Sequence, residues 1–124
     1  MSFAAWLAFL AGAGVGAPSR YVLDGYIQSK TGRFFPWGTF VINATGSLLL
    51  GILTGLALEH GLSTTTETVL GTGFCGAFTT YSTFTFETVR LAEEGATNAA
   101  LRNIAANVVV GTVVAGVALA VTLR

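Results

Sequence analysis

The chain has 124 residues, and its six basic and six acidic side chains give a formal net charge of zero. Only 10% of the residues are charged, 52% are hydrophobic and the mean hydropathy is +0.70, whereas soluble domains carry about 25% charged residues. This composition excludes an ordinary soluble domain and gives no reason to expect nucleic acid as a partner. It predicts a chain embedded in membrane lipid.

Four apolar segments of 21 to 23 residues follow one another along the chain. As a helix, each would cover about 30 Å of hydrocarbon, whereas a membrane-spanning strand would need only about 10 residues. The short polar segments between them leave no room for a further domain. We therefore predict a single all-α membrane domain over residues 1–124, with spans at about 3–23, 37–58, 69–89 and 101–123.

The first segment could be mistaken for the apolar part of a secretory signal, with "VGAPS" as its cleavage site. No basic residue precedes it and three similar segments follow, so we interpret it as the first span. Gly12 and Gly16 in this span, like Gly51 and Gly55 in the second, have the four-residue spacing that lets helix backbones approach closely.

Asn43 is the main polar side chain of the second segment, within "GTFVINATGSLLLG". Its amide can offer N–H groups to an anion without a charge that would trap the anion. A plain hydrogen bond between helices explains the same residue about equally well. The sequence leaves both interpretations open.

The third segment, "GTGFCGAFTTYSTFTFE", combines glycines with β-branched and aromatic residues, which lower helix propensity. We predict a break in this helix, where freed carbonyl groups could bind a hard cation such as sodium. Tyr81 and Phe84 lie three residues apart, so their ring edges could face an anion, although core packing explains them more simply. Glu87 is either a functional carboxylate or the partner of Arg90 in a local ion pair.

In the fourth segment Asn103, Asn107 and Gly111 recur every four residues. This polar stripe could line a pore or pack against a partner. Basic residues fall mostly on one side of the predicted membrane: Arg20, Lys30, Arg33, Arg90 and Arg102 against Arg124 alone. The positive-inside rule therefore favours an orientation with both termini outside.

Over nearly its whole length the chain resembles the Fluc/CrcB family of bacterial fluoride channels. The resemblance rests on "GAGVGAPSRY", "GTFVINATGSLLLG" and above all "GFCGAFTTYSTFTFE". It implies a channel, not an enzyme, in the plasma membrane. It further implies a dual-topology dimer with two fluoride pathways along the subunit interface and a structural sodium ion at the dimer centre.

The resemblance also implies roles for particular residues. Main-chain carbonyls of Gly76 and Thr79 would hold the sodium ion. The residues implied for the fluoride pathway are Asn43, Tyr81, Phe84, Ser82, Thr83, Glu87 and Arg20, with Asn107 and Asn103 on the fourth helix.

Two features depart from the family pattern. Tyr81 stands where the family usually has phenylalanine, and its hydroxyl could donate a hydrogen bond or narrow the path. The charge bias also fits poorly with a homodimer of opposed subunits, which needs nearly balanced loops. We expect a homodimer, with a pair of related chains as the alternative.

The sequence thus predicts passive export of fluoride down its gradient, which would lower cytoplasmic fluoride and confer fluoride resistance. The alternative is a proton-coupled exporter of small organic cations, of the small multidrug type. Such an exporter usually needs a carboxylate within the first span, and none occurs between Phe3 and Leu23. A subunit that only assembles with others would leave the polar residues unexplained.

Overall fold

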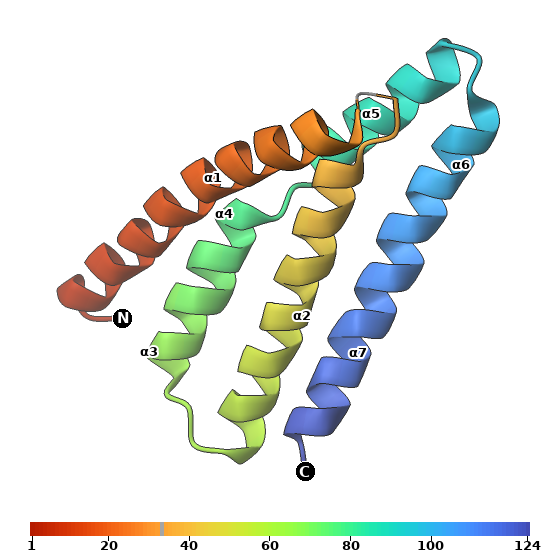
Figure 1. Ribbon diagram of the computed structural model, residues 1–124. Coiled ribbons are helices and arrows are strands. Elements are labelled where there is room, and N and C mark those ends of the chain that lie inside the picture. Colours follow the sequence, from red (N-terminus) through yellow and green to blue (C-terminus); the bar gives the residue numbers. More distant parts are fainter. Residues whose placement is uncertain (33) are drawn as a thin grey trace.

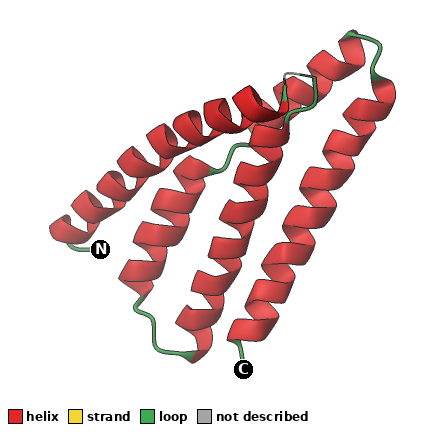
Figure 2. Cartoon of the chain, viewed as in Figure 1, coloured by secondary structure: helices red, strands yellow, loops and turns green. Residues whose placement is uncertain are grey.

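The computed structural model describes residues 1–32 and 34–124, so Arg33, one of the basic residues counted above, lies outside the described residues. Within them all regular structure is helical (Figures 1 and 2). Helix α1 spans Phe3–Thr31 and helix α2 spans Trp37–Glu59. The third rod consists of α3 (Thr64–Glu67), the π-helical turns η1 (Thr68–Cys75) and α4 (Gly76–Phe78), and is followed by α5 (Ser82–Glu93). The last rod runs through α6 (Thr97–Ala105), η2 (Ala106–Val110) and α7 (Gly111–Thr122).

The prediction of four helices with a broken third one is confirmed for the described residues. The break falls at residues 79–81, between α4 and α5, and α5 continues in a different direction from α4 (Figure 1). The α2–α3 connection and the C-terminus lie at one end of the bundle, and the α5–α6 turn lies at the other. The bounds of the lipid-embedded parts stay predictions.

Glycines set the close approach of the helices. A Cβ atom on Gly16 would lie 2.5 Å from the carbonyl oxygen of Phe74, so α1 and η1 touch backbone to backbone. A Cβ atom on Gly51 would likewise lie 2.5 Å from the carbonyl oxygen of Ala115, where α2 packs on α7. Gly12 and Gly55 lie at similar contacts, with the Val69 carbonyl oxygen and the Thr122 side chain, so both glycines of each four-residue spacing lie where helices approach closely.

Large apolar side chains cover the outside of the bundle instead of filling its centre. Among the helices of residues 1–32 and 34–124, two, Trp37–Glu59 and Thr97–Thr122, are long and apolar enough to cross a membrane, with mean hydropathies of 1.8 and 2.3 in their most apolar windows. Only 28% and 6% of those windows are buried within the chain. The exposed apolar surface requires lipid or another subunit to cover it.

Candidate functional site

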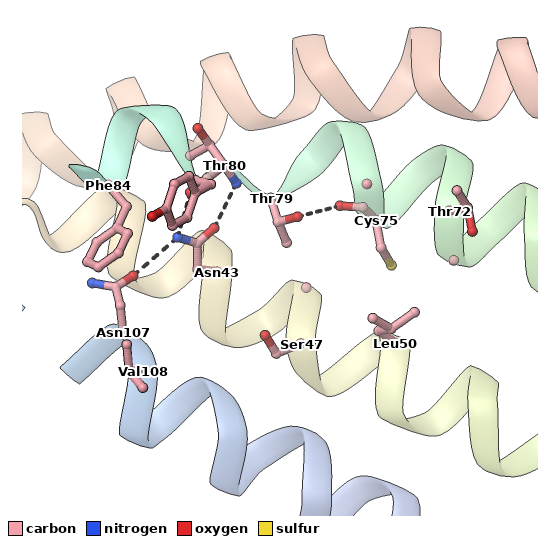
Figure 3. A pocket seen from close by; sticks show the side chains of 14 residues that line it. Asn43, Ser47, Leu50, Thr72, Cys75, Thr79, Thr80, Phe84, Asn107 and Val108 are labelled. Atoms are coloured by element: carbon pink, nitrogen blue, oxygen red, sulfur yellow. Dashed lines mark hydrogen bonds between the residues drawn. The ribbon is translucent and has the colours of Figure 1, made fainter. Parts of the chain in front are cut away.

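A hollow of about 450 Å³ opens beside the break in the third helix (Figure 3). It lies between α2, the η1–α4 rod, the start of α5 and η2. None of the described residues that line it is charged. They are Asn43, Gly46, Ser47, Leu50, Gly71, Thr72, Cys75, Gly76, Thr79, Thr80, Tyr81, Phe84, Asn107 and Val108.

The backbone leaves the helix at Thr79, whose φ of −79° and ψ of 162° are extended. The next residue, Thr80, therefore has a free N–H and a free C=O group in the middle of the bundle. The side chain of Asn43 pairs with both: its Oδ1 accepts from the Thr80 N–H at 2.9 Å, and its Nδ2 donates to the Thr80 carbonyl at 3.0 Å. Asn43 thus replaces the hydrogen bonds that the broken helix gives up.

The second N–H of the Asn43 amide donates to Oδ1 of Asn107 on η2, at 3.2 Å (Figure 3). Asn107 in turn donates to Asn103, through Nδ2 to the backbone carbonyl at 2.9 Å and to Oδ1 at 3.0 Å. The polar residues of the second and fourth segments, separated by 60 or more positions, are therefore directly connected. The sequence left two interpretations of Asn43 open, a hydrogen bond between helices and a role in an anion pathway. The structure contains the hydrogen bond and also places Asn43 beside an uncharged hollow.

The carbonyl groups of Gly76 and Thr79 lose the donors that a regular helix would supply. The Gly76 carbonyl would accept from the Thr80 N–H, which is bound to Asn43. The Thr79 carbonyl would accept from the Thr83 N–H, which donates instead to the Thr80 hydroxyl at 3.1 Å. Two carbonyl oxygens at the edge of one hollow are thereby left available to a hard cation, which prefers oxygen ligands.

Tyr81 and Phe84 lie at the start of α5 and both line the hollow. Their ring centroids are 6.0 Å apart and the ring planes are inclined by 63°, an edge-to-face arrangement. Tyr81 is 78% exposed in the single chain, so its ring points out of the subunit. The sequence suggested core packing as the simpler explanation of this pair. Tyr81 is not part of the core of the single subunit, so that explanation does not apply to it.

A second, smaller hollow of about 170 Å³ shares one lining residue, Thr80, with the first. It is mostly polar and is lined by Arg20, Tyr21, Asp24, Thr39, Ile42, Thr80 and Thr83. Oδ1 of Asp24 is buried there and has no hydrogen-bond partner among the described residues. Arg20 and Asp24, one helical turn apart on α1, therefore bring a guanidinium and a carboxyl group to the same hollow.

Glu87 accepts a hydrogen bond of 2.6 Å from the Thr39 hydroxyl, which joins α5 to α2. Arg90 does not pair with Glu87; its guanidinium lies 3.6 Å from Glu94 on the same helix and donates to the Phe34 carbonyl at 3.5 Å. The local ion pair that the sequence offered for Glu87 is therefore not formed in the structure. Glu87 faces the neighbouring helix instead.

The structure brings most of the predicted site residues to one of the two hollows. Ser82, which is exposed, and Glu87, which is bound to Thr39, line neither hollow. Sequence reasoning did not assign a role to Thr39 or Thr80. Thr39 precedes Asn43 by one helical turn, a spacing that could have indicated it, whereas no pattern identified Thr80 as the residue common to both hollows.

Residues 7–120 match the family described as "CrcB-like protein, Camphor Resistance (CrcB)". The chain is 55% identical over 106 residues to the fluoride-specific ion channel FluC 1 of Streptomyces avermitilis, covering 86% of each chain. It is 46% identical over 122 residues to FluC 1 of Frankia casuarinae, covering 93% of this chain and 95% of that one. It is 44% identical over 107 residues to FluC of Syntrophotalea carbinolica, covering 82% and 84%.

These matches favour a channel over the proton-coupled exporter kept as the alternative, and they identify a family of ion channels, not of enzymes. The exposed apolar helices agree with a membrane location. The family that the sequence motifs predicted is therefore confirmed. The chain belongs to the CrcB family of fluoride-specific ion channels.

Proposed function

We propose that this chain conducts fluoride passively across the membrane, and that the uncharged hollow beside Asn43 is part of the pathway. The observation that carries this proposal is the Asn43 amide at the edge of the hollow: its two N–H groups donate to neutral acceptors, the Thr80 carbonyl and Oδ1 of Asn107, and no charged residue lines the hollow. A small anion must exchange its water for other hydrogen-bond donors, and neutral donors do this without binding it too tightly. Export down the gradient would lower cytoplasmic fluoride.

The aromatic pair supplies the next part of the proposed pathway. The edge of an aromatic ring carries partial positive charge. The inclined rings of Tyr81 and Phe84 lie at the same hollow as Asn43, so the anion would pass from amide N–H groups to ring edges. The smaller hollow, which contains Arg20, Asp24 and Thr83, would be the approach from solution, with the Arg20 guanidinium offsetting the charge of a carboxylate at Asp24.

A second subunit completes this pathway. The hollow and the exposed Tyr81 face outward from the single chain, and lipid cannot satisfy the polar groups that line it. A second chain placed against this face would enclose the hollow. We propose a dimer of two copies in opposite orientations, with a pair of related chains as the arrangement that the charge bias would favour.

The carbonyl groups of Gly76 and Thr79 fit a structural sodium ion at the centre of this dimer. Each has lost its helical donor and lies at the face where the second subunit would dock. Two carbonyl oxygens from each chain would provide four oxygen ligands. The bound cation would supply a positive potential close to the fluoride path and would hold the two broken helices together.

The test is fluoride efflux from liposomes that contain only this purified chain. The vesicles are loaded with potassium fluoride, valinomycin releases the potassium counter-charge, and a fluoride electrode records the efflux. We expect rapid fluoride efflux and none in parallel vesicles loaded with potassium chloride. Absence of efflux from well-folded protein, both alone and with a related second chain, would refute the proposed function.

A further inference from the structure

Asn103 is fully buried and lies on α6, one helical turn before Asn107. It lines neither hollow, yet it makes hydrogen bonds on both sides of its amide. Its Nδ2 donates to the Thr88 hydroxyl on α5 at 2.8 Å, and its Oδ1 accepts from Asn107 at 3.0 Å. A buried amide with both ends bound fixes the orientation of its neighbours.

The orientation of each amide follows from groups whose roles are unambiguous. The Thr88 hydroxyl donates to the Phe84 carbonyl at 2.8 Å, so it must accept from Asn103. The oxygen of the Asn103 amide is therefore directed at Asn107, whose Nδ2 also donates to the backbone carbonyl of Asn103. This leaves the carbonyl oxygen of Asn107, not its N–H, to face Asn43.

The opposite end of the chain of hydrogen bonds gives the same answer independently. The Thr80 backbone N–H can only donate, so it fixes Oδ1 of Asn43 on its own side. Nδ2 of Asn43 must then face Asn107, as it does. Two backbone groups, the Phe84 carbonyl and the Thr80 N–H, thus fix the direction of three consecutive amides between them.

We propose that Asn103 is a positioning residue for conduction. It keeps the carbonyl of Asn107 turned towards Asn43, so that one N–H of Asn43 is held at the hollow by a neutral acceptor that fluoride can displace. Without the Asn103 side chain, Nδ2 of Asn107 keeps only the backbone carbonyl of residue 103 as its acceptor, so one of its two N–H groups is released. The anion would then meet an additional donor, bind more tightly and leave more slowly. This inference rests on the proposed function.

The test measures the current through single channels in planar bilayers. We expect Asn103→Leu, which is similar in size but cannot form hydrogen bonds, to lower the unit fluoride current about 3-fold to about 20-fold, the range that corresponds to measured membrane hydrogen bonds. In an Asn107→Leu background, the same change is expected to have no further effect. A role in folding alone would lower the number of channels and leave the unit current unchanged.

Thr88→Val provides a second variant that leaves the amides in place. It removes the acceptor that orients Asn103, so the unit current is expected to fall in the same direction. Thr85→Val is the matched control on the same helix, because the Thr85 hydroxyl donates to carbonyls of its own turn, those of Tyr81 and Ser82. We expect its unit current to equal that of the wild type.

Two results would overturn the inference. The first is a unit current in Asn103→Leu equal to that of the wild type. The second is that Asn103→Leu lowers the unit current by the same factor in the wild-type chain and in the Asn107→Leu variant. The wild-type chain in the same bilayers tests the proposed function separately. If the chain is not a fluoride channel, the wild type itself carries no fluoride current.

Discussion

Replacing Asn43 with aspartate changes one group of the side chain and leaves its size unchanged. The variant keeps the acceptor for the Thr80 N–H but loses both N–H donors. A carboxylate oxygen would then face the Thr80 carbonyl, which lies 3.0 Å from the present nitrogen, and Oδ1 of Asn107, which lies 3.2 Å from it. Three oxygen acceptors would meet with no proton between them.

The cost to fluoride follows from the new charge. Two unit negative charges about 4 Å apart repel by about 4 kcal/mol at an effective dielectric constant of about 20. A barrier raised by this amount lowers a rate about 10³-fold. We therefore expect Asn43→Asp to reduce fluoride efflux from liposomes to the level of protein-free vesicles.

The matched control is Asn98→Asp, the same chemical change at an exposed position in the first turn of α6. A carboxylate near a helix N-terminus is tolerated or favourable, so its efflux should equal that of the wild type. Size-exclusion chromatography in detergent checks that both variants fold and assemble. If efflux from folded Asn43→Asp stays within about threefold of the wild type, a change no larger than an average membrane hydrogen bond of about 0.6 kcal/mol would cause, Asn43 does not lie on the pathway.

Two further predictions concern packing and the aromatic pair. Gly16→Ala places a Cβ atom 2.5 Å from the Phe74 carbonyl, so it should lower the stability towards unfolding by about 1–3 kcal/mol. Gly14→Ala, which meets nothing within 4 Å, should leave the melting temperature in detergent unchanged or raise it, because alanine favours a helix over glycine by about 1 kcal/mol. Equal melting temperatures of the two variants would contradict the close α1–η1 contact. Tyr81→Phe keeps the ring edge and should conserve the unit fluoride current, whereas Tyr81→Leu should lower it about 2-fold to about 12-fold. A Tyr81→Leu current equal to that of the wild type would remove the ring from the pathway.

The sequence by itself determined that the protein is a helical membrane protein and where its third helix is broken. Four apolar segments of spanning length require helices, because lipid offers backbone groups no hydrogen-bond partners. Glycine and β-branched residues between Gly71 and Thr85 weaken the third helix, and the break lies within this stretch, at residues 79–81. These properties depend on composition and local spacing, which a sequence contains directly.

The tertiary structure alone decided which polar groups meet. Asn43 finds Thr80 37 residues away and Asn107 64 residues away, and Glu87 pairs with Thr39 instead of the nearby Arg90. Such pairings depend on how the helices pack and on the direction that the chain takes after the break. Each amide orientation, moreover, depends on the donor or acceptor role of the preceding group. Local sequence patterns contain no information on helix packing, on the chain direction after the break or on amide orientation. The sequence could therefore indicate that these residues are polar and embedded, while the fold determined what each of them binds.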